Sequence, residues 1–351
     1  MSRKIKTAII GYGKSAKHFH VPLLKAVDDF EIRSVLQRTK SDSKQDLPDA
    51  KLMRDMKDLL KDDRLDLVII TTPNHLHFDQ AFAALNADKH VVVEKPFTVS
   101  SGAAGKLIRL AESRKRILTV YHNRRWDNDF LTVKKVLNSK VLGEIVEVES
   151  SFSRFRNYLR DDAWKEKDLP GSGILYDISP HLIDQALLLF GNPQRIYADI
   201  RAQRSGDADD WFEINLFYPG LNVKLKAGML VPEPSPRFIV RGKKGTYIKF
   251  GLDPQESALA AGKNPNSENW GSEPEQNWGT MYREVEGEIV KEKVESVRGD
   301  YLKFYQKLKY AIDQKKEPPV NPATAKKGIQ IIEKAIESSR QGRVLDLQFD
   351  D

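Results

Sequence analysis

Residues 4–16 of this chain read KIKTAIIGYGKSA, an apolar run that ends in a glycine turn. The run predicts a buried strand, and the residues after the turn predict a helix. The spacing Gly11-x-Gly13-x-x-Ala16 is that of a dinucleotide fingerprint. Gly11 allows the tight turn, Gly13 lets the backbone approach a pyrophosphate, and Ala16 lets the helix approach the strand. This stretch therefore predicts a nucleotide site near the beginning of the chain.

Three valines mark another buried strand farther along. Residues 90–97 read HVVVEKPF, in which the valines favour a strand buried on both faces. Pro96 ends that strand because proline has no N–H for a sheet ladder. Lys95 is therefore predicted at the carboxyl end of a parallel strand, the edge of an open α/β sheet where ligands bind. A surface lysine on a loop is the alternative interpretation of Glu-Lys-Pro taken alone.

Strands and helices alternate around these two stretches, as in a doubly wound parallel sheet. Further strands are predicted at residues 30–36, 65–71 and 117–121, and helices at residues 15–27, 74–87 and 100–114. Pro22 is expected to split the first helical run in two, since proline does not fit a helix interior. Polar clusters follow two strands, at residues 71–77 and 122–126. We expect both clusters on the same rim as Lys95, in cofactor contacts or helix caps.

The second strand ends at Gln37-Arg38-Thr39-Lys40. A protein selective for NAD places an acid at this point to hold the ribose 2′-hydroxyl, and no acid stands here. Arg38 and Thr39 can instead hold a 2′-phosphate, and the planar fork of Arg38 matches phosphate oxygens best. We therefore predict NADP as the cofactor, with NAD possible. The alternative is that these residues are only exposed loop cations.

Composition narrows the class of protein. The chain has 351 residues, of which 40% are hydrophobic and 30% charged, and this predicts a globular protein of two domains. The lack of cysteine excludes disulfides, thiolate zinc sites and thiol nucleophiles. No apolar run approaches the ~18 residues of a membrane span and no signal peptide is recognisable, so a cytoplasmic location without a membrane partner is predicted.

Charge and histidine spacing exclude two further kinds of site. The net charge of +7 is spread among acidic residues without a basic block, which favours anionic small molecules over nucleic acid. His75, His77 and Asp79 lie close together without a third well-placed ligand, so no metal site is predicted.

The pattern changes after residue 121, which divides the chain into predicted domains of residues 1–121 and 122–351. A helix is predicted at 128–137, and strands then follow one another at residues 145–155, 195–203, 211–218, 223–230, 237–241 and 246–250. Apolar and polar residues alternate in the first of them, as in a strand with one wet face. The second domain is thus predicted as α+β with a large, mostly antiparallel sheet. A long loop at residues 253–280 and helices at 301–313 and 324–339 complete it.

Residues 171–184, GSGILYDISPHLID, carry the second candidate set of reacting groups. In one continuous helix, Asp177 and His181 are four residues apart and share a face. Pro180 leaves two alternatives open: it lies inside the helix and kinks it, or it begins the helix after Ser179.

Three motifs in this order resemble the Gfo/Idh/MocA oxidoreductases over essentially the whole chain: the fingerprint, Glu94-Lys95-Pro96, and Gly171-x-Gly173-x-x-x-Asp177-x-x-x-His181. Residues 121–130 and 252–256 are similar to the branch of that family that oxidises scyllo-inositol with NADP. The chain departs from the family at Ala16 and Ser172, which replace glycines. Lys165 also follows Trp164 where relatives often have arginine, which puts that cofactor contact in doubt.

The resemblance implies a Rossmann domain, a C-terminal sheet that joins subunits into a homodimer or homotetramer, and a catalytic set of Lys95, Asp177 and His181. The fingerprint, the polar clusters and the resemblance together predict cofactor contacts from Gly11, Gly13, Lys14, Ser15, Arg38, Thr39, Thr72, Pro73, Asn74, His77, Glu94, Lys95, Asn123 and Trp164.

The implied reaction is oxidation of a secondary alcohol in a cyclic polyol or sugar. His181 is the candidate base, because the ordinary pKa of histidine lies near neutrality, and Lys95 stabilises the developing charge on the oxygen. Asp177 orients the histidine or the substrate hydroxyls. Two alternatives stay open: a dehydrogenase or reductase of another sugar, and a cofactor-binding sensor that has lost catalysis.

Overall fold

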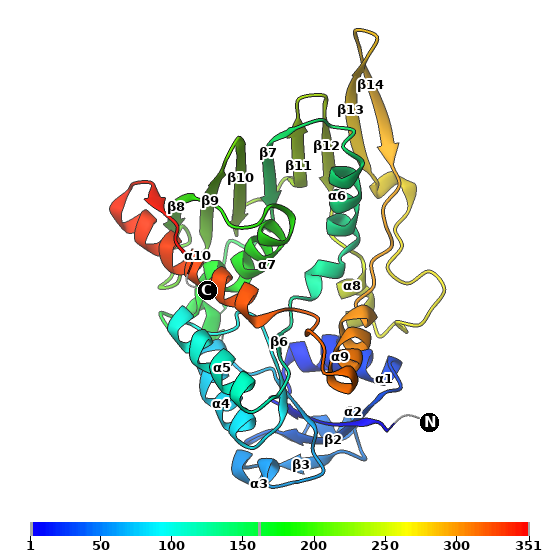
Figure 1. The fold of residues 1–351 in the computed structure, drawn as a ribbon, viewed down its shortest axis with the longest axis vertical. Helices are drawn as coiled ribbons and strands as arrows, with labels where there is room; N and C mark the ends of the chain where they lie inside the picture. Colours follow the sequence, from blue (N-terminus) through cyan, green and yellow to red (C-terminus); the bar gives the residue numbers. More distant parts are fainter. Residues whose placement is uncertain (1–2, 161–162, 350–351) are drawn as a thin grey trace. The chain divides into compact units, whose positions relative to one another are not determined.

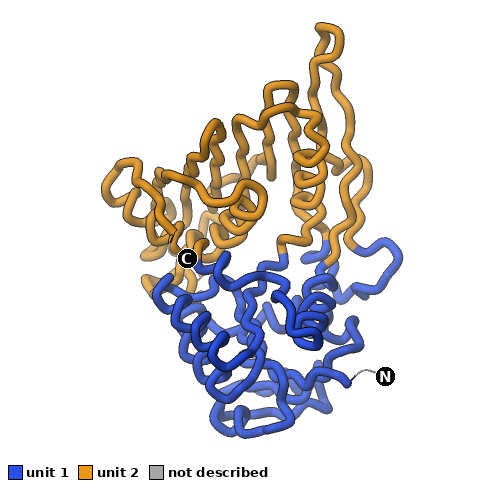
Figure 2. Tube along the Cα trace, viewed as in Figure 1, with its two compact units in different colours: residues 1–123, 255–270, 301–326 blue, residues 124–254, 271–300, 327–351 orange. Residues whose placement is uncertain are grey.

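The computed structural model describes residues 3–160 and 163–349. The chain divides into two compact units, and each unit is assembled from three separate segments (Figure 2). The first unit holds residues 1–123, 255–270 and 301–326, and the second holds residues 124–254, 271–300 and 327–351. The chain therefore leaves the first unit and returns to it twice.

A parallel six-stranded sheet forms the centre of the first unit (Figure 1). Its strands are β1 (Ile5–Ile10), β2 (Phe30–Leu36), β3 (Lys51–Met53), β4 (Leu67–Ile70), β5 (His90–Val93) and β6 (Leu118–Val120). The spatial order β3-β2-β1-β4-β5-β6 is that of a Rossmann fold, whose strand order reverses between β1 and β4. The predicted doubly wound parallel sheet is confirmed.

The helices of the first unit connect these strands and cover them. They are η1 (Ala16–His20), α1 (Val21–Ala26), α2 (Ser43–Asp46), α3 (Met56–Leu60), η2 (Asn74–Leu76), α4 (His77–Asn86), α5 (Ser101–Ser113), α8 (Gln255–Ala260) and α9 (Leu302–Gln314). The pairs α4 with α5 and α1 with α9 are in contact.

Pro22 does not break the first helical run. The π-helix η1 leads directly into α1, and Pro22 is the second residue of α1. Proline cannot donate a bond to the preceding turn, and the wider π-turn lies where that bond is missing. The predicted division of the run at Pro22 is therefore observed as a change from π-helix to α-helix, without a gap between the two.

The segment between β2 and β4 contains structure that periodicity did not indicate. β3 is an edge strand of only three residues, and α3 has five. Asp55 caps α3, since its side chain accepts hydrogen bonds from the backbone N–H groups of Lys57 and Asp58 at 2.6 and 3.3 Å. Elements this short depend on such local contacts more than on a repeating apolar pattern.

A mixed, mostly antiparallel nine-stranded sheet forms the second unit, as predicted. Its order is β14-β13-β12-β11-β7-β10-β9-β8-β15, and only the β7–β10 pair is parallel among the described pairings. The strands are β7 (Ile145–Ser151), β8 (Arg195–Arg201), β9 (Trp211–Tyr218), β10 (Leu221–Gly228), β11 (Pro236–Gly242), β12 (Gly245–Phe250), β13 (Gly279–Val285), β14 (Glu288–Val294) and β15 (Leu345–Asp346).

One face of this sheet is covered by helices and the other is polar. Its helices are η3 (Asn123–Trp126), α6 (Asn128–Ser139), η4 (Trp164–Glu166), α7 (Gly173–Phe190), η5 (Glu275–Asn277) and α10 (Pro322–Gln341), of which η3 and α10 begin in the first unit. α7 packs on β9 and β10, and α6 packs on β11. Along β10, Val223, Leu225 and Ala227 are buried while Lys224 and Lys226 are part-exposed.

The segment predicted as a long loop at residues 253–280 is partly structured. It contains α8 and η5, and its last two residues begin the β13–β14 hairpin, which the sequence did not predict. β14 mixes charged and apolar residues without a buried position, and β13 buries only Gly279 and Met281, so their pattern resembles a loop. Among the described residues, no helix is both long and apolar enough to span a membrane.

Candidate cofactor site and reacting groups

The fingerprint turn has the geometry that its glycines predict. Gly11 follows β1 with φ of +89°, and a Cβ there would lie 3.1 Å from side-chain atoms of both Thr71 and Thr72. Gly13 is exposed, and a Cβ there would meet no described atom within 4 Å. Gly11 is thus required by the chain itself, whereas Gly13 leaves open space over the helix start at Lys14 and Ser15, as a bound pyrophosphate needs.

The turn after β2 presents the two residues predicted to select the cofactor. Arg38 and Thr39 are exposed, and Arg38 makes no hydrogen bond or ion pair within residues 3–160 and 163–349. Arg54 braces this turn: its guanidinium donates to the Gln37 carbonyl at 2.9 Å and to the Ser41 hydroxyl at 2.7 Å. The turn is therefore held in shape while the Arg38 guanidinium stays available to an anion.

His77 ties together the ends of two strands. Its ring is fully buried, and its nitrogens lie 2.9 Å from the carbonyl oxygens of Thr72, after β4, and Pro96, after β5. Burial lowers its pKa. The structure gives His77 this bracing role, and its direct contact with a cofactor stays a prediction, as it does for Pro73 and the buried Asn74.

The end of β5 carries the central lysine. Lys95 is half-buried, and its backbone N–H donates to Glu94 Oε2 at 3.1 Å. The other carboxylate oxygen of Glu94 accepts from the Ser15 hydroxyl and lies 3.0 Å from His20 Nε2. Burial raises the pKa of Glu94, but hydrogen bonds from His20 and Ser15 and the charges of His20 and Lys95 outweigh it and lower that pKa to about 2.

The second unit carries Asp177 and His181 on α7. Pro180 lies inside this helix, so of the two alternatives the continuous helix is observed, and the two side chains share a face. Asp177 accepts a hydrogen bond from Lys165 Nζ at 2.6 Å. The lysine that replaces the family's usual arginine therefore pairs with the predicted catalytic aspartate. Trp164, before it on η4, has its ring centroid 5.8 Å from the same ammonium.

The start of α7 explains the second glycine of its motif. Gly173 has φ of +78°, and a Cβ there would lie 2.1 Å from Asp209 Oδ1. Asp209 accepts a hydrogen bond from the N–H of Leu175 at 2.7 Å, which anchors the first turn of the helix. Burial and the charge of Asp210 raise the pKa of Asp209 to about 6, although its backbone hydrogen bonds oppose this.

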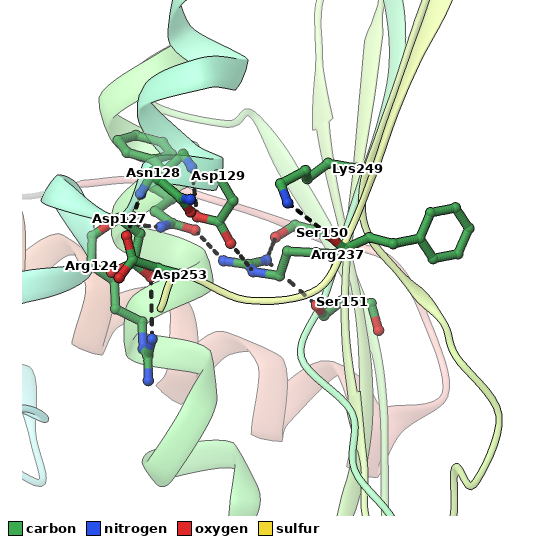
Figure 3. A network of polar contacts seen from close by, with 12 residues as sticks. Arg124, Asp127, Asn128, Asp129, Ser150, Ser151, Arg237, Lys249 and Asp253 are labelled. Atoms are coloured by element: carbon green, nitrogen blue, oxygen red, sulfur yellow. Dashed lines mark hydrogen bonds and ion pairs between the residues drawn. The ribbon is translucent and has the colours of Figure 1, made fainter. Parts of the chain in front are cut away.

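Buried hydrogen bonds of Gln185, one turn after His181, anchor α7 to its neighbours in the second unit. Gln185 donates to the carbonyl of Arg124 at 2.9 Å and accepts from Arg237 Nη2 at 2.8 Å. Arg237 also donates to Ser150 Oγ at 2.6 Å and pairs with Asp129 at 3.2 Å, as Figure 3 shows. These contacts connect α7 to β7, β11 and α6.

The two segments that resemble one branch of the family, residues 121–130 and 252–256, take part in hydrogen bonds that shape the fold. Asp253 accepts a hydrogen bond from the N–H of Asn128 at 2.6 Å, so the second-unit parts of these segments, residues 124–130 and 252–254, meet at the start of α6 (Figure 3). Gln255, in the first unit, accepts from Trp270 Nε1 at 2.9 Å and from the N–H of Tyr301 at 2.7 Å. These residues have structural roles.

Comparison with known proteins identifies the family. A family described as "Oxidoreductase family, NAD-binding Rossmann fold" matches residues 5–122, and its partner, "Oxidoreductase family, C-terminal alpha/beta domain", matches residues 134–347. The chain belongs to the Gfo/Idh/MocA oxidoreductase family. Its Rossmann unit is accordingly an NAD(P)-binding unit.

Full-length relatives of this Gfo/Idh/MocA protein carry two kinds of name. The scyllo-inositol 2-dehydrogenase (NADP(+)) IolW of Bacillus subtilis is 38% identical over 348 residues, covering 98% of this chain and 96% of that protein. The uncharacterized oxidoreductase YdgJ of Escherichia coli is 42% identical and covers 99% of this chain and all of YdgJ. The solved structure of the putative oxidoreductase yvaA from Bacillus subtilis superposes with a TM-score of 0.95 at 37% identity, with 99% of each chain covered.

Sequence reasoning missed several residues that hold the predicted ones in place: His20, Arg54, Lys165 as the partner of Asp177, Gln185, Asp209, Arg237 and Tyr305. Helical spacing places His20 one turn after Ala16, which is a signal that could have drawn attention to it. Its partner Tyr305 lies 285 residues away, and no local pattern connects the two.

Asn123, a predicted cofactor contact, is buried in η3 after β6. Among the described residues, no group of three or more histidine, aspartate or glutamate side chains is arranged to hold a metal ion.

Proposed function

We propose that this chain is an NADP-preferring dehydrogenase of a secondary alcohol in a cyclic polyol or sugar, with scyllo-inositol as the substrate to test first. The observation that carries the proposal is the similarity to IolW, a protein named for this activity, over 98% of the chain. The presence of Lys95, Asp177 and His181 in the predicted elements supports catalysis, because a sensor has no need to keep all three.

The residues of the Rossmann unit fit the cofactor. Gly13 leaves room for the pyrophosphate, and the helix start after it offers N–H groups to phosphate oxygens. Arg38 is exposed and available for a 2′-phosphate. The nicotinamide, when bound, accepts the hydride from the carbinol carbon.

In this proposal the protein's own side chains hold and deprotonate the alcohol. His181 takes the hydroxyl proton, and Lys95 donates a hydrogen bond to the same oxygen as negative charge develops on it. Asp177, held by Lys165, accepts a hydrogen bond from a neighbouring substrate hydroxyl. The polar outer face of the nine-stranded sheet, with Lys224 and Lys226, is proposed to meet a second copy of the chain in a homodimer or homotetramer.

The first test follows reduced-nicotinamide absorbance with scyllo-inositol and NADP or NAD in parallel, extended to a small panel of polyols and aldoses. Turnover of scyllo-inositol with at least tenfold higher kcat/KM for NADP is expected. Turnover of another sugar alone would overturn the substrate. Tight cofactor binding without any turnover would favour the sensor.

Arg38→Ala tests cofactor choice. The NADP/NAD ratio of kcat/KM is expected to fall on the order of 10- to 100-fold, as loss of a charge-assisted phosphate contact worth about 1.5–3 kcal/mol implies. Arg64→Ala is the matched control, because Arg64 is also exposed in the first unit but pairs with Asp62 at 3.1 Å. An unchanged ratio in the Arg38 variant would contradict the NADP assignment.

A further inference from the structure

His20 is a completely buried histidine of the Rossmann unit and lies outside the set of predicted site residues. It lies at the end of η1, one turn after the fingerprint, and its side chain is 0% exposed. Buried polar side chains are costly unless they are hydrogen-bonded, and both ring nitrogens of His20 have a partner.

The first partner connects His20 to Lys95. Its Nε2 lies 3.0 Å from Glu94 Oε1, the carboxylate oxygen that also accepts from the Ser15 hydroxyl. The second Glu94 oxygen accepts from the Lys95 backbone N–H at 3.1 Å. One carboxylate therefore joins the predicted phosphate-binding turn, the buried histidine and the predicted catalytic lysine.

The second partner lets His20 carry a proton without losing a bond. Its Nδ1 lies 2.5 Å from the hydroxyl of Tyr305, which comes from α9 in the same unit. A tyrosine hydroxyl donates to a neutral imidazole and accepts from an imidazolium, so the contact suits both forms. Burial raises the pKa of Tyr305 well above its ordinary value, which keeps that hydroxyl protonated.

The remaining neighbours of His20 are aromatic. The Tyr121 ring centroid lies 4.2 Å from the imidazole, and the Tyr305 ring meets it edge-on at 6.3 Å. The rings pack against the imidazole and exclude water from it. The titratable groups facing His20 are thus Glu94, Tyr121 and Tyr305, and the charge of Lys95 acts on the same carboxylate.

We propose that His20 is a positioning residue for Lys95: through Glu94 it fixes the end of β5 and partly neutralises the carboxylate beside the lysine. A neutralised carboxylate stabilises the Lys95 ammonium less, so the ammonium is a stronger acid and a stronger hydrogen-bond donor to the substrate oxygen on which negative charge develops. A bound phosphate that draws the Ser15 hydroxyl away from Glu94 would change this balance, which couples cofactor binding to Lys95.

The test measures Lys95 directly and needs no substrate, although the inference rests on the proposed role of this lysine. The folded protein is labelled with acetic anhydride from pH 6 to 11, and acetylation of the peptide that contains Lys95 is quantified by mass spectrometry. His20→Gln keeps an N–H for Glu94 but removes the imidazole that can take up a proton beside the carboxylate. It is expected to move the midpoint of Lys95 labelling to higher pH and to slow labelling at pH 8 by about three- to tenfold.

His18→Gln is the matched control, because His18 is two residues earlier in the same helical segment. In this variant the midpoint of Lys95 labelling should equal that of the unaltered protein. An unchanged midpoint in His20→Gln, with or without a lower melting temperature, would mean that His20 only fills the core and would overturn the proposal. Failure of the polyol assay alone would leave the labelling result unaffected, so the two proposals fail separately.

Tyr305→Phe keeps the ring packing but removes the hydroxyl at Nδ1 of His20. It is expected to shift the Lys95 midpoint in the same direction as His20→Gln and by less, because an imidazolium without a partner at Nδ1 is disfavoured. This variant keeps the inference testable if His20→Gln does not fold. A shift to lower pH in Tyr305→Phe would contradict it.

Discussion

The two regions that carry the predicted reacting groups are held in different ways. Lys95 follows the short strand β5, and the part-buried carboxylate beside it is bonded to Ser15 and His20. On α7, by contrast, the partner of Asp177 is Lys165, whose side chain is 37% exposed, and the buried hydrogen bonds of Gln185 lie farther along the helix. The difference indicates a fixed lysine and an aspartate whose pairing can yield to a substrate.

We expect the largest effect for a change at Lys95. Lys95→Ala should lower kcat on the order of 10²- to 10⁴-fold, as loss of a group that assists proton transfer does, while cofactor binding measured by fluorescence titration is retained. Lys89→Ala is the control, because this buried lysine of the same unit bonds the Asp62 carbonyl at 3.1 Å, away from the end of β5. Near-normal turnover in Lys95→Ala would remove the lysine from the mechanism.

The anchoring of α7 predicts the next largest effect. Arg237→Met leaves Asp129 buried without its ion pair and should cost about 3–5 kcal/mol of unfolding free energy, measured by urea denaturation. Arg241→Met is the matched control, since Arg241 is 41% exposed, pairs with Glu147 and Glu149, and should cost less than about 1 kcal/mol. Equal losses in the two variants would show that the buried network does not anchor the helix.

We expect the stability of the protein to depend on pH through Asp209, which anchors the start of α7. Because the pKa of Asp209 is raised to about 6 in the folded protein, its protonated form is favoured by folding. The resulting stability is fully present below the unfolded pKa of about 4 and is lost as pH rises through 6, a change of about 3 kcal/mol. Asp209→Asn should remove this component from the pH profile of the melting temperature. A profile identical to that of the unaltered protein would be inconsistent with a raised pKa.

We expect the smallest effect for a change at Lys165, the partly exposed partner of Asp177. Lys165→Met removes the 2.6 Å contact to Asp177 and should change stability by less than about 1 kcal/mol, because the pair is partly exposed. KM should rise about three- to tenfold with kcat nearly unchanged, since a substrate hydroxyl then meets a less ordered carboxylate. Lys165→Arg should restore KM. A large fall in kcat instead would show that Lys165 acts in the chemical step.

Local sequence patterns predicted the strands and helices of both regions better than the contacts that hold them in place. The fingerprint, the Val91–Val93 strand and the 171–184 helix were predicted because each has a strong apolar or glycine pattern within a few residues. β3 and α3 were missed because they are short, and the β13–β14 hairpin was missed because β13 buries only two residues and β14 none. The cofactor and catalytic assignments stay predictions.

The contacts that hold these elements in place could not be predicted, because they join residues far apart in the sequence. His20 and Tyr305 are 285 residues apart, Asp253 and Asn128 are 125 apart, and periodicity carries no information about such pairs. Lys165 is instructive: the sequence showed that it departs from the family, but only the structure showed Asp177 as its partner.

The return of residues 301–326 to the first unit has a consequence for how the protein is made. During synthesis the sheet strands emerge within the first third of the chain, but the α9 wall that includes Tyr305 emerges only near the end. Until then the ring of His20 lacks the partner at Nδ1, and the apolar surface of α1 that α9 covers is open to water. A growing chain therefore carries an incomplete Rossmann core for most of translation, which is the stage at which it most needs protection by chaperones.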